Sequence, residues 1–189
     1  MKKEDLIQEA FSEVDRAGFV LPQYLESVNV DAPLPIGEGQ TISQPTTVRM
    51  MLEWLAARPG DKVLDIGSGS GWTTALLSNI VGPKGKVFAV ERIEKLKEFG
   101  EKNCRNAGVK NVEFYIAGPT LGLPENAPFD RILVSAAAEE MPEELLDQLK
   151  TGGKMVIPIG NSIFEIKKEK NKLKRIEHQG FVFVPLIRE

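Results

Sequence analysis

Cysteine and histidine are nearly absent from this chain of 189 residues, which has one of each, Cys104 and His178. One cysteine excludes an internal disulfide framework, and one histidine leaves too few nitrogen and sulfur ligands for an ordinary zinc site. The same shortage excludes a Cys-His catalytic pair and leaves little basis for a Ser-His-Asp triad. We therefore expect no metal, and we interpret Cys104 as a small packing residue within a helix.

Long apolar runs and an excess of positive charge are also missing. No stretch reaches the ~18 apolar residues of a membrane span, and the polar start Met1–Asp5 does not resemble a signal peptide. The 24 Lys and Arg against 27 Asp and Glu give a net charge of −3, whereas a duplex-binding domain usually has a basic excess. We expect a cytoplasmic monomer with no membrane association, and nucleic acid is a disfavoured partner.

The length and composition fit one globular domain, because 42% of the residues are apolar and 27% are charged, and a domain takes roughly 100–200 residues. We divide it into three parts. Residues 1–57 hold an N-terminal helix, a substrate or lid segment and a capping helix. Residues 58–160 form a cofactor-binding core, and residues 161–189 form antiparallel strands.

Strands and helices alternate along the core. The predicted strands are 62–66, 86–91, 112–117, 131–135 and 154–159, and the predicted helices are 72–81, 93–107 and 142–150. This alternation predicts an α/β fold with a doubly wound, mostly parallel sheet and helices on both faces, as in Rossmann-like proteins. The segments 163–166, 173–177 and 181–184 have no helix between them, which predicts antiparallel strands at the sheet edge.

The first 57 residues are less regular. Apolar residues at helical spacing predict an amphipathic helix over 4–16. Residues 18–44 contain several prolines and glycines and show no period, so we expect an irregular segment that serves as a lid or binding loop. Ser43 is predicted to cap a helix that has Pro45 in its first turn and ends near Ala57.

A glycine-rich turn is the strongest chemical signal. Gly67, Gly69 and Gly71 follow a predicted strand and precede a predicted helix, so the backbone can approach a ligand closely. Glu91 ends the next predicted strand about twenty residues later, where an acid can accept hydrogen bonds from ribose hydroxyls. Together these features predict a site for a nucleoside cofactor.

Two features favour S-adenosylmethionine over a dinucleotide. The glycine spacing differs from the G-x-G-x-x-G turn that cradles a pyrophosphate, and Asp65 just before it would repel a pyrophosphate and attract a cation. Residues 135–138, Ser-Ala-Ala-Ala, are not the Asn/Asp-Pro-Pro-aromatic cluster of methyltransferases that modify amino groups of bases. Base methylation therefore loses support.

The stretch 33–45, PLPIGEGQTISQP, resembles the signature of protein-L-isoaspartate (D-aspartate) O-methyltransferases. Further similar stretches are 14–16, 19–20, 65–71, 120–124, 127–132, 152–153 and 183–186. The resemblance implies a class I methyltransferase fold and transfer of a methyl group from S-adenosylmethionine to the α-carboxylate of L-isoaspartyl residues in damaged proteins, leaving S-adenosylhomocysteine. The methyl ester then closes to a succinimide, which reopens partly to normal aspartate.

The resemblance also implies site residues. Ser43 matches the active-site serine of the family, and residues 40–43 match the boundary between cofactor and substrate. The implied cofactor-binding residues are Gln40, Thr41, Ile42, Asp65, Gly67, Ser68, Gly69, Gly71, Glu91, Arg92 and Gly118. The implied substrate-binding residues are Pro35, Ile36, Gly37, Gly39 and Ser43.

One departure from the family concerns the cofactor. The family usually has Gly-Asp-Gly after its third strand, with the acid on the adenine amino group, whereas this chain has Ala117-Gly118-Pro119. A lost hydrogen bond to a charged acceptor predicts weaker cofactor binding. Two alternatives therefore stay open: a related S-adenosylmethionine-dependent enzyme with another acceptor, and a catalytically weak or inactive homologue that acts as a binding module.

Overall fold

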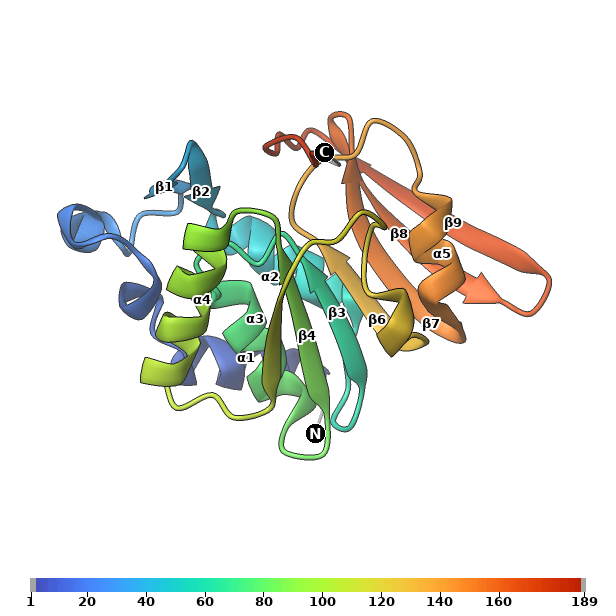
Figure 1. The fold of residues 1–189 in the computed structure, drawn as a ribbon, viewed down its shortest axis with the longest axis horizontal. Helices are drawn as coiled ribbons and strands as arrows, with labels where there is room; N and C mark the ends of the chain where they lie inside the picture. Colours follow the sequence, from blue (N-terminus) through green and yellow to red (C-terminus); the bar gives the residue numbers. More distant parts are fainter. Residues whose placement is uncertain (1–2, 188–189) are drawn as a thin grey trace.

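Seven strands form one twisted sheet in the order β5-β4-β3-β6-β7-β8-β9 (Figure 1). The structure is a computed structural model that describes residues 3–187, so the last two residues of the predicted part 161–189 lie outside it. The strands are β3 Lys62–Ile66, β4 Lys86–Glu91, β5 Val112–Ile116, β6 Phe129–Val134, β7 Leu149–Ile159, β8 Ser162–Glu169 and β9 Lys172–Gln179. Strands β3 to β7 pair in parallel, and β8 and β9 add antiparallel pairs at one edge. The predicted α/β fold is confirmed.

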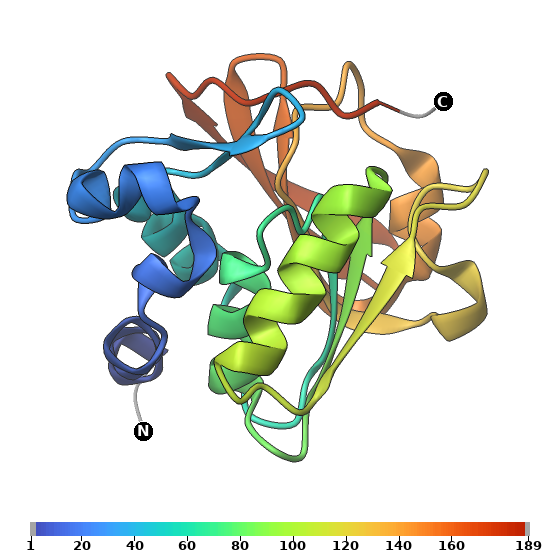
Figure 2. The same cartoon turned by 60° about the vertical axis from the view of Figure 1, so that its left-hand side comes forward.

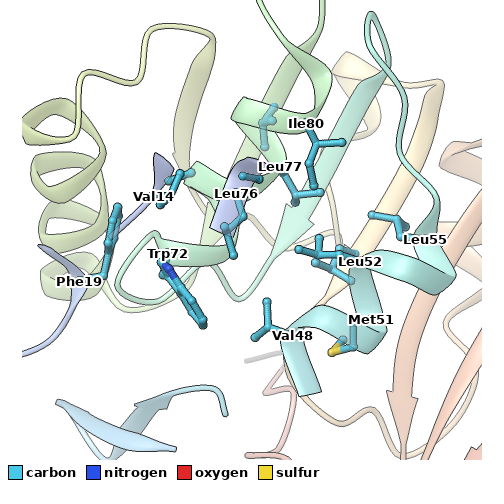
Figure 3. Packing of buried hydrophobic residues seen from close by; sticks show 14 of the residues in the cluster. Val14, Phe19, Val48, Met51, Leu52, Leu55, Trp72, Leu76, Leu77 and Ile80 are labelled. Atoms are coloured by element: carbon cyan, nitrogen blue, oxygen red, sulfur yellow. The ribbon is translucent and has the colours of Figure 1, made fainter. Parts of the chain in front are cut away.

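Alternate strand residues serve two separate cores. Val63 and Val87 belong to one apolar cluster, whereas their neighbours Leu64 and Phe88 belong to the other. The first cluster packs against α1 Lys3–Glu13, α2 Pro45–Leu55, α3 Trp72–Val81 and α4 Glu94–Asn106, and the second packs against α5 Glu143–Gln148. Figure 3 shows the side chains of α2 and α3 meeting in the first cluster. Among the helices described, none has the length and apolar composition needed to cross a bilayer.

The last predicted strand, 181–184, is wrong. The chain leaves the sheet after β9, and Val184 and Leu186 bond instead to Ala137, beyond the end of β6, through its N–H (2.8 Å) and its carbonyl (2.7 Å). The segment therefore runs across the carboxyl ends of the parallel strands (Figure 2). Its apolar alternation is used in packing over that end of the sheet rather than in a ladder with β9.

The segment 18–44 contains more regular structure than predicted. It includes two 3-10 helices, η1 Arg16–Phe19 and η2 Pro22–Ser27, and a hairpin of β1 Leu34–Gly37 with β2 Gln40–Ile42. Strands of four and three residues, one of them interrupted by a proline, are too short to give a period that the sequence reveals. The first helix is also shorter than predicted, since Asp15 caps η1 instead.

The predicted cap of α2 is wrong as well. Gln44 occupies the N-cap position and its side chain makes no capping bond. Instead, Asp31 accepts hydrogen bonds from the N–H of Thr46 (2.9 Å), the Thr46 hydroxyl (2.8 Å) and the Gln44 amide (2.9 Å). These bonds lower the pKa of Asp31. A carboxylate fifteen residues away in sequence thus does what a local cap usually does.

Arg16 ties these N-terminal elements together. Its guanidinium is buried and donates to the carbonyls of Val28 (2.8 Å), Val30 (3.3 Å), Ala32 (2.9 Å) and Ser43 (3.2 Å). The planar fork of an arginine matches several acceptors at once, which a lysine ammonium on a flexible stem does not. Arg16 therefore fixes the path of residues 28–32 against the entrance to α2.

We expect Arg16→Lys to lower the free energy of unfolding by roughly 2 kcal/mol or more, because buried carbonyls would lose their donors. Urea unfolding measures this change. Arg105→Lys is the control, since Arg105 makes an exposed pair with Glu101. Equal midpoints for the two variants would contradict the role assigned to Arg16.

Candidate active site

A cleft of about 170 Å³ opens at the carboxyl ends of the central parallel strands, the usual ligand position in open α/β sheets. Four parts of the chain line it: the β1–β2 hairpin, the glycine turn after β3, the ends of β4, β5 and β6, and the C-terminal segment 184–187. Figure 2 shows the hairpin and the C-terminal segment at this same end of the sheet. The cleft is thus built from both ends of the chain.

Close backbone approaches explain two glycines of the turn. Gly69 has φ of 51°, and a Cβ on it would lie 3.1 Å from Cδ1 of Ile36 in the hairpin. Gly71 has φ of 86°, and a Cβ there would lie 2.7 Å from the carbonyl oxygen of Gly100 in α4. A side chain at either position would push the turn away from its neighbours.

Helix α4 holds the glycine turn through two hydrogen bonds. The Asn103 amide donates to the carbonyl of Ser70 (3.0 Å), and the Cys104 thiol donates to the carbonyl of Gly71 (3.3 Å). Burial, together with the nearby charge of Asp65, raises the pKa of Cys104 to about 12. The thiol therefore stays protonated and packs against the turn, as the sequence suggests, rather than acting as a nucleophile.

Glu91 lines the cleft at the end of β4 with a fixed carboxylate. One oxygen accepts the N–H of Gly69 (2.9 Å), and the other accepts the N–H groups of Arg92 (2.8 Å) and Ile93 (3.0 Å). Each carboxylate oxygen can accept more than one hydrogen bond. Glu91 can therefore orient the glycine turn and still accept from two hydroxyls of a ligand.

Asp65 has a different environment, beneath the turn. It is fully buried, and one of its oxygens accepts the Thr74 hydroxyl at 2.6 Å. Burial raises its pKa to about 7, the Thr74 bond lowers it, and the charge of Glu91 raises it. Asp65 does not line the cleft, so the structure does not bring its carboxyl to the position where direct contact with a cofactor was predicted.

Ser43 lines a second, smaller cavity of about 30 Å³ that adjoins the cleft. The two spaces share Thr41, Gly67, Gly69 and Ser135. The Ser43 hydroxyl makes no hydrogen bond to the rest of the described chain, whereas its carbonyl accepts from Arg16. We name this space, lined by Thr41, Ile42, Ser43, Gly67, Ser68, Gly69, Ser70, Trp72, Thr73 and Ser135, the polar cavity.

Most of the predicted site residues come together. Those that line the main cleft are Ile36, Gln40, Thr41, Gly67, Gly69, Glu91, Arg92 and Gly118. Those that line only the polar cavity are Ile42, Ser43 and Ser68. Those that line neither are Pro35, Gly37, Gly39, Asp65 and Gly71. The hairpin glycines and Pro35 therefore shape the turn from outside the cleft, and Gly71 packs on α4.

Several lining residues escaped the sequence-based prediction. The main ones are Ser135, Ala136, Glu144 and the segment 184–187. The family-like stretch 183–186 was a signal, but nothing in its pattern places it over the cleft. Where the loop after β5 offers Gly118 and Pro119, the acids that line the cleft within residues 3–187 are Glu91 and Glu144. The described part of the chain contains no group of three or more His, Cys, Asp or Glu residues able to hold a metal ion.

Comparison with known proteins identifies the family. A family model described as protein-L-isoaspartate(D-aspartate) O-methyltransferase matches residues 1–189. A protein-L-isoaspartate O-methyltransferase of Pyrococcus horikoshii is 44% identical over 193 residues, covering 99% of this chain and 87% of the relative. One of Thermococcus onnurineus is 46% identical over 196 residues, with coverage of 99% and 87%.

Solved structures agree with these matches. A protein-L-isoaspartate O-methyltransferase has a TM-score of 0.89 and 33% identity, with 96% of this chain and 61% of that chain covered. A Plasmodium falciparum protein described as such an enzyme, in complex with S-adenosyl-L-homocysteine, has a TM-score of 0.86 and 28% identity, with coverage of 98% and 91%. By its sequence over its full length and by its fold, the chain belongs to the protein-L-isoaspartate (D-aspartate) O-methyltransferase family.

Proposed function

We propose that this protein transfers a methyl group from S-adenosylmethionine to the α-carboxylate of L-isoaspartyl residues in damaged proteins. The observation that carries the proposal is the junction of two spaces: a nucleoside-sized cleft at Glu91 and the glycine turn, and the polar cavity at Ser43. The family to which the chain belongs supports the same reaction.

The residues of the cleft fit the cofactor. The turn at Gly67 and Gly69 leaves its backbone open to the cleft, and Glu91 accepts hydrogen bonds there in a fixed orientation, as a ribose requires. The bound cofactor supplies a methyl group on a positively charged sulfur. We assign Gln40, Thr41, Arg92 and Gly118 to the walls around it.

The acceptor needs alignment more than activation. A carboxylate is ionised at pH 7 and is already a nucleophile, so a methyl transfer to it requires an in-line approach and exclusion of water rather than a general base. The hairpin and the segment 184–187 both border the cleft and limit the access of solvent. We assign to the Ser43 hydroxyl the role of donating to one carboxylate oxygen of the acceptor.

The partners follow from the same site. Isoaspartyl peptides and proteins are the proposed substrates, with Ile36 of the hairpin nearest to the cleft among the substrate-binding residues of the strand β1. We propose a monomer, because residues of one chain line the whole cleft. Nucleic acid stays a disfavoured partner at a net charge of −3. The buried, unpaired Cys104 is compatible with a cytoplasmic location.

An assay of methanol release tests the function. The protein is incubated with the methyl donor and an isoaspartyl peptide, and the methanol formed after ester hydrolysis is compared with that from the same peptide containing normal aspartate. We expect methanol from the isoaspartyl peptide alone. Equal release from the two peptides, or none from either, would overturn the proposed substrate.

Ser43→Ala should lower the turnover of an isoaspartyl peptide by more than about tenfold, because one hydrogen bond to a charged oxygen is lost. The dissociation constant of S-adenosylhomocysteine should change little. Initial rates at saturating donor and calorimetric binding measure the two effects. Ser12→Ala, on the exposed side of α1, is the control. Unchanged turnover in the Ser43 variant would remove the proposed role.

Gly100→Ala should weaken binding of S-adenosylhomocysteine by about tenfold. The added Cβ would lie 2.7 Å from the carbonyl oxygen of Gly69 and 3.2 Å from the nitrogen of Gly71, so the glycine turn must shift. Alanine is a better helix former than glycine by about 1 kcal/mol, so a loss of helix stability is not the expected cause. Gly18→Ala is the control, since a Cβ there meets nothing within 4 Å. Equal dissociation constants for the two variants would refute this account.

Asp65→Asn should stabilise the protein more at pH 8 than at pH 5. Because the pKa of Asp65 is about 7 in the folded protein and near 4 in an unfolded chain, its stabilising contribution is complete below pH 4 and is lost as the pH rises to 7. We expect the variant to gain about 2 kcal/mol over the native protein between these pH values. Urea unfolding at several pH values measures the gain, with the exposed Asp147→Asn as control. A gain that does not depend on pH would contradict the assignment.

A further inference from the structure

Two buried hydrogen-bond donors of the polar cavity have no partner. Within residues 3–187, the Ser68 hydroxyl and the Trp72 indole N–H make no hydrogen bond, although the two residues are only 6% and 3% exposed. A buried polar group without a partner costs free energy, so native structures seldom contain one without a reason. Both residues line the polar cavity, which suggests that a ligand supplies the missing acceptor.

Helix α3 begins at the same cavity. Trp72 and Thr73 form its first turn and line the cavity, and Gly71 at the N-cap position provides no side-chain cap. The first N–H groups of a helix lack partners within it, and they carry the positive end of the helix dipole. A helix of ten residues thus directs an additional attraction for negative charge at the two unpartnered donors.

A buried cation contacts two residues of the cavity wall. The Arg16 guanidinium lies 5.3 Å from the centre of the Trp72 ring and donates to the Ser43 carbonyl at 3.2 Å. Phe11 packs edge-on against the other part of the ring arrangement, at 5.6 Å between ring centres. Figure 3 shows Trp72 at the start of α3. The indole is therefore held in place, and the nearby positive charge favours an anion.

The size of the cavity selects among anions. Its volume of about 30 Å³ is roughly two to three times what one water needs, which suits the two oxygens of a single carboxylate. The nearest acid, Asp65, already bonds to Thr74. We propose that the polar cavity is a carboxylate-binding site in which the Trp72 indole N–H and the Ser68 hydroxyl donate to one carboxylate group.

This inference rests on the proposed function, which brings two carboxylates to the site: that of the donor's amino-acid part and that of the acceptor. The test uses Trp72→Phe, which removes the N–H and keeps an aromatic ring, and Ser68→Ala. Trp54→Phe is the matched control, because Trp54 stacks on His178 and lines neither space. Dissociation constants are measured by calorimetry for S-adenosylhomocysteine and for 5′-methylthioadenosine, which lacks the amino-acid part, and KM is measured for an isoaspartyl peptide at saturating donor.

Either of two outcomes supports the site and identifies its occupant. If the donor's carboxylate binds there, each variant weakens S-adenosylhomocysteine about tenfold or more and leaves methylthioadenosine unchanged. If the acceptor's carboxylate binds there, both nucleosides bind as before and KM rises about tenfold. The Trp54 variant should match the native protein in every measurement.

Three outcomes overturn the site. One is a change below about twofold in both dissociation constants and in KM. Another is an equal weakening of both nucleosides, which would indicate a disturbed cleft rather than a lost carboxylate contact. If the native protein fails to methylate isoaspartyl peptides, the proposed function fails separately. The two nucleosides then decide the inference alone, and unchanged binding of S-adenosylhomocysteine overturns it.

Discussion

The buried guanidinium of Arg16 holds the catalytic end of this molecule in shape. It satisfies carbonyls of residues 28, 30, 32 and 43, which would otherwise be buried without donors. Between these acceptors the chain forms the β1–β2 hairpin, so its two ends are fixed by one side chain. The same guanidinium lies against Trp72 at the start of α3. The hairpin, the polar cavity and the glycine turn are therefore positioned together.

The cleft depends on a second constraint, the close approach of the glycine turn to α4. Gly71 and Gly100 face each other with no room for a Cβ, and Asn103 and Cys104 bond to the turn from the same helix. These contacts fix the backbone that a cofactor must meet. Since the parallel strands all end at this edge, the hairpin and the C-terminal segment can cover it from two sides (Figure 2).

The two acids beside the glycine turn have opposite environments and so different tasks. Glu91 accepts three backbone N–H groups and lines the cleft as a fixed acceptor. Asp65 is sealed beneath the turn with one hydroxyl partner, and burial raises its pKa to about 7. A site of this kind needs no histidine, because the acceptor carboxylate is nucleophilic without one. Its donors are hydroxyls, backbone N–H groups and an indole.

The sequence by itself determined the parallel core. Buried strands such as 62–66 and 86–91 and the helix 72–81 show strong local patterns, and the structure has them at the predicted bounds. It also determined the pairing of the glycine turn with Glu91, because strand ends and turns obey local rules. Only the tertiary structure decided that Asp31 caps α2, that Arg16 anchors the hairpin, that Asp65 lies away from the cleft, and that residues 184–187 cover it. Each of these depends on contacts between residues distant in the chain, for which a single sequence carries no periodic signal.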